Sequence, residues 1–96
     1  MRVMLKATLD TERANELVRS GRMSDVMRET LEHIKPEAAY FGALDGRRTA
    51  LLFFHMQDSS ELPALNERFF TEMSAEVEVC PIMNGDDLAK GLSQMR

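Results

Sequence analysis

The sequence has few of the residues that build disulfides, metal clusters and membrane spans. Its 96 residues include one cysteine, Cys80, which excludes an intrachain disulfide, a CxxC redox pair and a cysteine-based zinc cluster. No apolar run approaches the roughly 20 residues of a membrane-spanning helix. The charged residues Lys6 and Asp10 interrupt the N-terminal stretch before a signal-peptide core can form. These absences predict a cytoplasmic protein that does not associate with membranes.

Positive charge is also scarce. The chain carries 12 Lys and Arg against 16 Asp and Glu, for a net charge of −4 at pH 7. Binding to nucleic acid depends on clustered Lys and Arg, so this composition argues against a DNA or RNA partner. The adjacent pair Arg47 and Arg48 falls in an expected turn, where solvated charges are common. No motif indicates a metal site, and we expect no cofactor.

What is present is the composition of one globular domain. Hydrophobic residues make up 44% of the chain and charged residues 29%, which is typical of folded proteins. A chain of this length forms a single domain over residues 1–96. It buries about 60 to 70% of its unfolded surface, so its core provides only marginal stability. A contact with a second subunit would add to that stability.

The first part of the chain has a strand pattern followed by a helical one. Residues 2–8 (RVMLKAT) alternate in polarity, which predicts a strand. Residues 11–34 repeat apolar side chains at spacings of three and four, which predicts helix. Gly21 interrupts this phase and Ser24 can cap a new segment, so the pattern allows either one kinked helix or two shorter ones.

The middle of the chain predicts a β-hairpin. Pro36 ends the preceding helix, because the residue before a proline is pushed out of the α region. A strand is expected over residues 37–44 (EAAYFGAL), followed by a tight turn at Asp45-Gly46, where both positions tolerate positive φ. The antiparallel return strand is then residues 48–56 (RTALLFFHM).

The last part of the chain predicts a helix, a strand and a short helix. Ser59 or Ser60 is expected to cap a helix that carries Pro63 in its first turn, where proline costs no hydrogen bond. Residues 75–83 (AEVEVCPIM) alternate and predict an edge strand, because their proline cannot donate to a ladder. Residues 84–96 predict a further helix with one apolar face. That face comprises Leu88, Leu92 and Met95.

The element order β-α-β-β-α-β with an appended helix predicts an α+β, ferredoxin-like antiparallel sheet. Right-handed crossovers place both main helices on one face and leave the other face bare. Residues 48–56 are apolar on both faces, since Leu51 and Phe53 share a side with His55 while Leu52 and Phe54 point the other way. At about 25 cal/mol per Å2, leaving such side chains in water forfeits several kcal/mol, so we expect a second copy to cover the bare face. The alternation does not determine which set faces the helices.

Two stretches of the chain carry a family likeness: KPEAAYFGALDGRRTALLFFHM, residues 35–56, and VCPIMNGDDLAKGL, residues 79–92. They resemble small, mostly uncharacterised members of the dimeric α/β-barrel superfamily, and the likeness extends over nearly the whole chain. The resemblance implies a homodimer in which two ferredoxin-like sheets pack face to face into a barrel, with a ligand cavity in each half. Better characterised relatives are cofactor-independent antibiotic-biosynthesis monooxygenases, muconolactone isomerases and stress-responsive barrel proteins. The monooxygenases depend on a tryptophan, and this chain contains none.

Four side chains are candidates for ligand contact. The imidazole of His55 can act as acid, base or hydrogen-bond partner, or His55 is simply a hydrogen-bonded histidine at the rim of the sheet. Lys6 and Glu78 are expected on one face of adjacent strands, where they either hold an anionic or carbonyl-bearing ligand or pair with each other. Tyr40 has a hydroxyl that can orient a ligand, although an aromatic residue in a strand more often belongs to the core.

These residues support three hypotheses for function. The first is a homodimer that binds a small apolar or carbonyl-bearing molecule in a cavity between sheet and helices of the barrel. The second is a cofactor-independent isomerase or monooxygenase, in which His55 or Glu78 abstracts a proton next to a carbonyl. The third is a purely structural or interaction dimer. No motif identifies a reaction, so the sequence leaves the ligand and any catalysis open.

Overall fold

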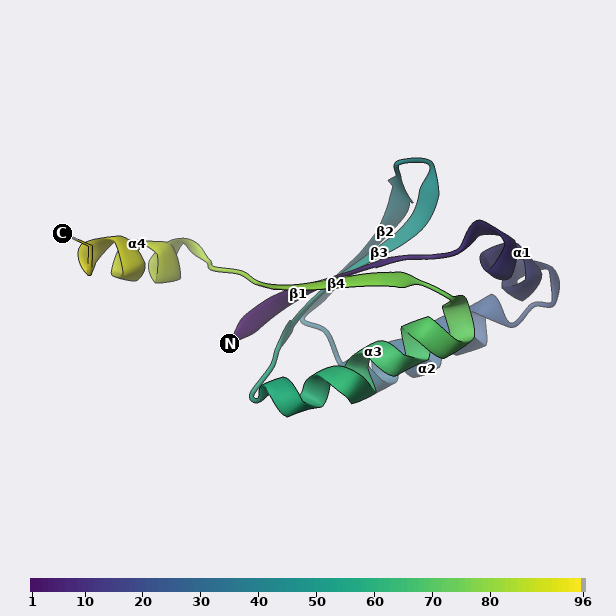
Figure 1. Ribbon diagram of the computed structural model, residues 1–96, viewed down its shortest axis with the longest axis horizontal. Coiled ribbons are helices and arrows are strands. Elements are labelled where there is room, and N and C mark those ends of the chain that lie inside the picture. Colours follow the sequence, from purple (N-terminus) through teal and green to yellow (C-terminus); the bar gives the residue numbers. More distant parts are fainter. Residues whose placement is uncertain (96) are drawn as a thin grey trace.

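The computed structural model describes residues 1–95 and has one antiparallel sheet with helices on one side (Figure 1). The strands lie in the order β2-β3-β1-β4, so β1 and β3 are central. The strand bounds are β1, Arg2–Thr8; β2, Ala38–Leu44; β3, Arg47–His55; and β4, Glu76–Pro81. The protein is therefore an α+β fold with a four-stranded antiparallel sheet, an arrangement consistent with a ferredoxin-like fold.

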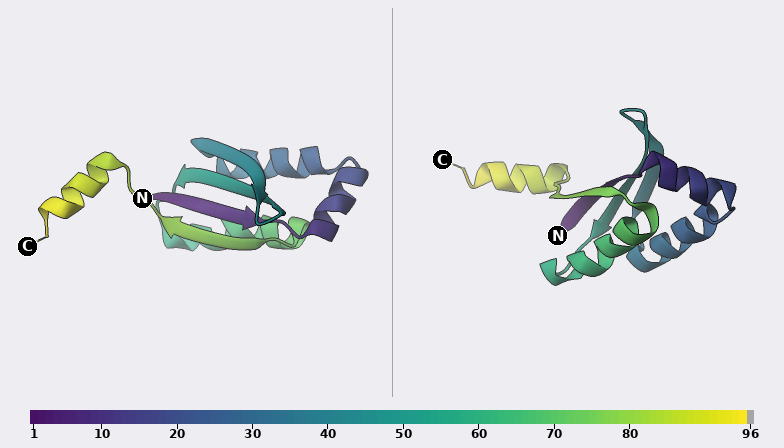
Figure 2. Two further views of the ribbon diagram at one scale, coloured as in Figure 1. Left: turned by 90° about the horizontal axis from the view of Figure 1, so that it is seen from above. Right: turned by 45° about the vertical axis from the view of Figure 1, so that its right-hand side comes forward.

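The helices form one layer and one projecting arm (Figure 2). Their bounds are α1, Thr11–Arg19; α2, Met23–Ile34; the 3-10 turn η1, Ser59–Glu61; α3, Leu62–Met73; and α4, Gly85–Ser93. Both views show α2 and α3 lying against the same face of the sheet, while α4 extends away from it beyond the end of β4. Within residues 1–95, no helix combines the length and the apolar character needed to cross a bilayer.

The first helical region is two helices. Gly21 adopts a φ of 77°, a left-handed conformation that glycine reaches without strain, and this turn separates α1 from α2. Asp10 caps α1 by accepting a hydrogen bond from the Arg13 backbone N–H at 2.9 Å. The prediction that Ser24 caps the second helix is wrong, because α2 already begins at Met23 and its N-cap residue, Arg22, provides no side-chain hydrogen bond.

The region before α3 is capped by Asp58, and the prediction that Ser59 or Ser60 is the cap is wrong. Asp58 accepts a hydrogen bond from the backbone N–H of Ser60 at 2.8 Å, and this bond lowers the pKa of the Asp58 carboxyl. The Glu61 carboxylate in turn accepts from the backbone N–H groups of Gln57 and Asp58, which closes a capping box. Pro63 lies in the first turn of α3, as expected.

The β2–β3 hairpin has the turn that its sequence predicts. Asp45 and Gly46 both adopt positive φ, 54° and 75°, the conformation that matches a two-residue turn to the right-handed twist of the strands. The turn sets a register in which Tyr40 faces Leu51 and Phe41 faces Ala50. Because paired residues point to the same side of a sheet, this register determines the face of every side chain in the hairpin.

The core lies between the sheet and the helices. The fully buried side chains come from β1, β3, α1, α2 and α3 and include Val3, Leu5, Leu17, Thr30, Leu52, Phe69 and Met73. In β3, Ala50, Leu52 and Phe54 face the helices and are buried, while Leu51 and Phe53 are only half-buried on the opposite side. We call these two sides the covered face and the open face. The structure thus places His55, which shares the alternation of Leu51 and Phe53, on the open face.

Candidate functional site

The open face carries a row of four side chains that crosses all four strands. Tyr40 of β2 pairs with Leu51 of β3, Leu51 pairs with Lys6 of β1, and Lys6 pairs with Glu78 of β4. Each pair lies directly opposite across its ladder, so the four side chains point to the same side. The row is apolar at the β2 end and charged at the β4 end. It contains three of the four residues that the sequence singles out.

The apolar half of this row is exposed to water in the single chain. Tyr40 is 63% exposed, and its ring packs edge to face on Phe53 with the centroids 6.2 Å apart. Met4 stands next to Phe53 in the neighbouring strand and is also half-buried. Within residues 1–95 no helix lies over these side chains, because α2 and α3 occupy the covered face (Figure 2). The open face is therefore a contiguous patch of apolar and aromatic side chains.

Lys6 and Glu78 face each other across the β1–β4 ladder without forming an ion pair. The neighbouring acidic residue on this face of β4, Glu76, does form an ion pair. Its carboxylate lies 3.4 Å from the Arg47 guanidinium. Glu78 is exposed and Lys6 is half-buried. Both charges are thus available to a ligand or to a partner on the open face.

His55 lies apart from the row. It pairs with Arg2 and lies four residues along β3 from Leu51. At roughly 3.4 Å per residue, this separates His55 from the row by about 14 Å. The Met1 amino group is 3.1 Å from its Nε2 atom and 3.3 Å from its Nδ1 atom. A donor nearly equidistant from both ring nitrogens cannot align with the lone pair of either, so this contact does not fix the imidazole as an oriented base.

A small hollow of about 220 Å3 brings both histidines together at one end of the helix layer. His33, His55 and Glu61 line it with apolar residues of α3. The Glu61 carboxylate is already bonded to two backbone N–H groups of its capping box. No cluster of three or more metal-binding side chains occurs in the part of the chain that the structure describes. Both bonds to Glu61 go to its Oε2 atom, so the capping box holds the Glu61 carboxylate in place within this hollow.

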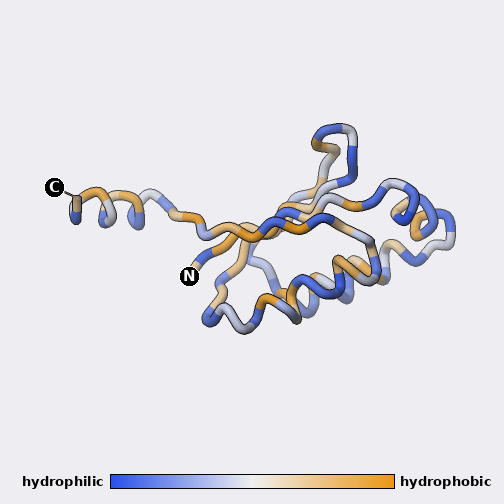
Figure 3. The backbone as a smooth tube through the Cα atoms, in the orientation of Figure 1, coloured by the Kyte–Doolittle hydropathy of each residue, from blue (hydrophilic) through white to orange (hydrophobic). Residues whose placement is uncertain are grey.

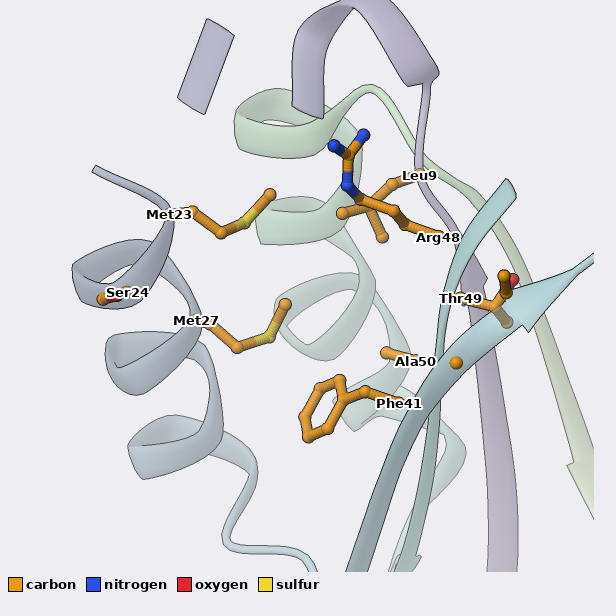
Figure 4. Close-up of a pocket in the computed structure, with 10 residues that line it drawn as sticks. Leu9, Met23, Ser24, Met27, Phe41, Arg48, Thr49 and Ala50 are labelled. Carbon is orange, nitrogen blue, oxygen red and sulfur yellow. The ribbon is translucent and has the colours of Figure 1, made fainter. Parts of the chain in front are cut away.

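A larger cavity, about 550 Å3 in volume, lies on the covered face between α2 and the β2–β3 hairpin (Figure 4). Its lining includes Met23 and Met27 of α2, Phe41 of β2, Ala50 of β3 and Leu9 after β1. None of the four sequence candidates lines it, since Tyr40, Lys6 and Glu78 point to the open face and His55 borders the smaller hollow.

The cavity exists because the helix layer does not extend under the whole hairpin. Phe41 faces the helix side, yet 55% of its surface is exposed. The small side chains of Ala43 and Ala50 leave the space next to Phe41 unfilled. Figure 4 shows the phenyl ring opposite Met27 across the cavity. The sequence held one signal of this site, because two adjacent strand aromatics, Tyr40 and Phe41, must point to opposite faces.

The two arginines of the hairpin differ in their surroundings. Arg47 donates to the Leu9 carbonyl oxygen at 3.1 Å and pairs with Glu76, so it anchors the hairpin to β1 and β4. Arg48 borders the cavity, and its guanidinium has no ion pair or side-chain hydrogen bond with any described residue. Figure 4 places that guanidinium beyond Leu9 at one end of the cavity, across from Met23. Arg48 is therefore the available charge of the site.

Fold and site together define an α+β domain with an uncovered sheet face and an apolar cavity that has a cationic end. No protein-family model matches the chain, and no curated protein matches it. Among solved structures it is similar to the "De novo designed protein Ferredog-Diesel", with 13% sequence identity and a TM-score of 0.49 over 84% of this chain and 85% of that chain.

Proposed function

We propose that this protein is a homodimer that binds a small apolar molecule with an anionic or carbonyl group in the cavity between α2 and the β2–β3 hairpin. The cavity of about 550 Å3 carries this proposal, because it falls within the range of about 300 to 1,000 Å3 that is usual for small-molecule sites. Its lining is mostly apolar and includes one guanidinium, that of Arg48, which is also usual for such sites.

The lining indicates the chemical class of the ligand. Met23 and Met27 supply flexible, polarisable side chains that adapt to ligands of varied shape, and Phe41 supplies an aromatic surface. The Arg48 guanidinium can donate two parallel hydrogen bonds to a carboxylate or to other paired oxygens. A ligand with an apolar body and one oxygen-rich end matches this arrangement of contacts.

In this proposal the open face is the dimer interface, and two ferredoxin-like sheets pack into an α/β barrel. Exposed Tyr40 and half-buried Leu51 and Phe53 form an apolar surface on the side of the sheet opposite to α2 and α3. A two-fold axis makes such a surface self-complementary, since the same patch serves both copies. Lys6 and Glu78 then sit within the interface, where they set its register.

Acid–base catalysis by His55 or Glu78 has less support from the geometry. The two side chains stand in different rows, about 14 Å apart along the strands at roughly 3.4 Å per residue. One small substrate cannot contact both, which favours ligand binding over this chemistry.

The proposal is tested with 1-anilinonaphthalene-8-sulfonate, a fluorescent probe that combines an apolar body with an anionic group. We expect the wild-type protein to bind it, and Arg48→Gln to weaken binding about tenfold, because a charge-assisted hydrogen bond contributes about 1.5 to 3 kcal/mol. Ala43→Trp should abolish binding, since the indole occupies the space beside Phe41. Fluorescence titration measures the affinity of each variant.

Arg19→Gln is the matched control, because it removes the same charge from an exposed position in the last turn of α1, away from the cavity. It should leave probe affinity unchanged. Equal affinity in the wild type, Arg48→Gln and Ala43→Trp would show that the probe binds elsewhere and would contradict the proposed site.

A further inference from the structure

The outer edge of β2 presents backbone groups that have no strand partner. Within residues 1–95, β2 is the first strand in the order β2-β3-β1-β4, so β3 lies on one side of it and no strand lies on the other. Its residues, Ala38–Leu44, therefore direct about half of their N–H and C=O groups away from the sheet. Figure 1 shows the turn end of this hairpin standing away from the helices. An exposed strand edge is a template on which a strand of another chain can pair.

The hairpin turn determines which residues of β2 point their backbone groups outward. The residue before a two-residue turn accepts a hydrogen bond from the residue after it, so Leu44 and Arg47 form a bonded pair. Bonded and non-bonded pairs then alternate along an antiparallel ladder. Every second residue before Leu44 thus bonds to β3. The residues between them point their N–H and C=O groups outward, and these are Ala39, Phe41 and Ala43.

The two edge strands of the sheet differ in charge. At the far edge, β4 carries Glu76 and Glu78, and Pro81 has no N–H to donate, so β4 has the features with which proteins prevent edge pairing. β2 has no charged side chain and no proline, and most of its residues are exposed. Figure 3 shows the hydrophilic residues of the hairpin at its turn and at the start of β3 rather than along β2. An uncharged strand therefore fits this edge best, and a second β2 is uncharged.

A second β2 also matches the first in shape and in hydrogen bonding. When two β2 strands run antiparallel about a two-fold axis at Phe41, Tyr40 of each copy lies opposite Gly42 of the other. Gly42 leaves room there, because a Cβ built on it would meet no atom of residues 1–95 within 4 Å apart from its chain neighbours. The two Phe41 rings meet on the covered face, where an aromatic pair is favourable. Ala39 then lies opposite Ala43, so the outward-pointing residues pair with each other and their donors meet acceptors.

We propose that the β2 edges of two copies pair antiparallel about Phe41 and join the two sheets into one continuous sheet. Because residues that pair across a ladder point to the same side, both copies keep their open faces on one side of the joined sheet. The contact therefore needs neither the open-face dimer nor a bound ligand. Phe41 lines the cavity at this edge, so the Phe41 ring of the second copy extends the aromatic wall of that site.

A contact made by one pair of strands is small. Interfaces that bury less than about 1,200 Å2 belong to weak and transient associations. We therefore expect the edge contact to form as the protein concentration approaches millimolar. Open-face dimers would remain separate from one another at micromolar concentration.

Disulfide formation between distinguishable chains tests the register. All chains carry Cys80→Ser, which removes the native thiol, and Phe53→Asp, which opposes the open-face dimer. One tagged chain carries Ala39→Cys and a differently tagged chain carries Ala43→Cys, and equal amounts are mixed at millimolar concentration and oxidised. In the proposed register these two positions form a hydrogen-bonded pair, whose Cα atoms are about 5.5 Å apart, within the range of a disulfide.

Like chains provide the internal reference of this experiment. Two Ala39→Cys chains hold their thiols four residues out of register, about 14 Å apart along the strands at roughly 3.4 Å per residue. We expect the mixed disulfide to exceed each disulfide between like chains about tenfold or more, whereas random encounter gives about a twofold excess. Both cysteine positions lie on the covered face, so packing between open faces cannot produce the mixed disulfide.

Phe41→Lys is the variant that breaks the contact, because it places two ammonium groups directly opposite each other at the axis. Phe41→Leu is its matched control, since it keeps an apolar side chain there. Phe41 is 55% exposed, so we expect both variants to fold, as circular dichroism can verify. Phe41→Lys should reduce the mixed disulfide to the statistical ratio, and Phe41→Leu should retain the excess. A statistical ratio without either change, or an equal excess in both variants, would overturn the inference.

The outcome is separable from that of the proposed function. If the wild type sediments as a dimer and binds the fluorescent probe but the mixed disulfide shows no excess, only the edge contact is refuted. If the mixed disulfide shows the excess while the wild type is monomeric at micromolar concentration, the edge contact stands and the open-face dimer fails.

Discussion

The two faces of the sheet show how similar side chains acquire different roles. Leu51 and Leu52 are neighbours in β3 and have the same chemistry, but Leu52 is fully buried on the covered face while Leu51 is half-buried on the open face. The difference comes only from what lies over each face, since α2 and α3 both lie on one side. Apolar pattern alone therefore does not separate a core residue from a residue on the open face.

The polar groups on the two faces differ as well. Among the described residues, the buried part of the covered face contains almost no charge. Arg48, the cation that could contact a ligand, stands at the end of the cavity. The open face carries Lys6 and Glu78 in the same row as Tyr40 and Leu51. A surface that mixes aromatic residues with a few charges is typical of recognition surfaces rather than of cores.

The largest expected effect comes from truncating the two leucines separately. Leu52→Ala should lower the free energy of unfolding by about 2 to 5 kcal/mol, because it leaves a cavity in the core. Leu51→Ala should remove only about 1 kcal/mol of burial from the single chain, since its surface is already partly wet. Urea denaturation followed by circular dichroism measures both losses.

The two variants should also differ in their dependence on protein concentration. If the open face is the proposed dimer interface, Leu51→Ala weakens the dimer, and its melting temperature should fall further below that of the wild type as the protein is diluted. Leu52→Ala should lower the melting temperature by a similar amount at each concentration. The same dilution behaviour for both variants would contradict the distinction between the faces.

A smaller effect is expected from the charges of the open face. A double-mutant cycle of Lys6→Met and Glu78→Gln should give a favourable coupling of about 0.5 to 1 kcal/mol, the usual size for a cross-strand pair of opposite charge. The coupling should decrease in 1 M salt if the pair is solvated and persist if a partner subunit covers it. A coupling of zero at low salt would show that the two charges do not interact.

The smallest expected effect comes from Asp58, the residue that caps η1 before α3. Hydrogen bonds from Ser60 lower the pKa of Asp58 below its ordinary value of 3.8, so the ionised carboxylate stabilises the folded state. That contribution is fully present above the unfolded pKa and is lost as the pH falls through the folded pKa. The stability difference between the wild type and Asp58→Ala should be constant from pH 7 to about pH 5 and shrink below about pH 4. Thermal melts across this range measure it, and a difference that grows with acidity would contradict the assignment.

The local elements follow directly from the sequence. The turn residues Asp45 and Gly46 predict the hairpin because few residue pairs tolerate positive φ twice in succession, and both positions adopt it. Alternation predicts β1 and β3, and the break at Gly21 allows the two helices that the structure shows. These features are determined by residues close together in the chain, so one sequence is enough to predict them.

The cavity was not predictable in the same way. It depends on where α2 starts relative to the hairpin, and that is a property of packing between segments distant in the chain. Sequence reasoning selected Tyr40 and missed Phe41, although alternation requires them to lie on opposite faces. It also treated Arg47 and Arg48 alike, whereas strand register gives one of them structural partners and leaves the other at the cavity.

Analytical ultracentrifugation of the wild type and Phe53→Asp tests most directly whether a second copy covers the open face. The account predicts a wild-type dimer at micromolar concentration, and a Phe53→Asp variant that is folded by circular dichroism but sediments as a monomer, because a buried unpaired carboxylate opposes association. A wild-type protein that remains monomeric throughout the micromolar range would contradict it, since the open face would then stay in water.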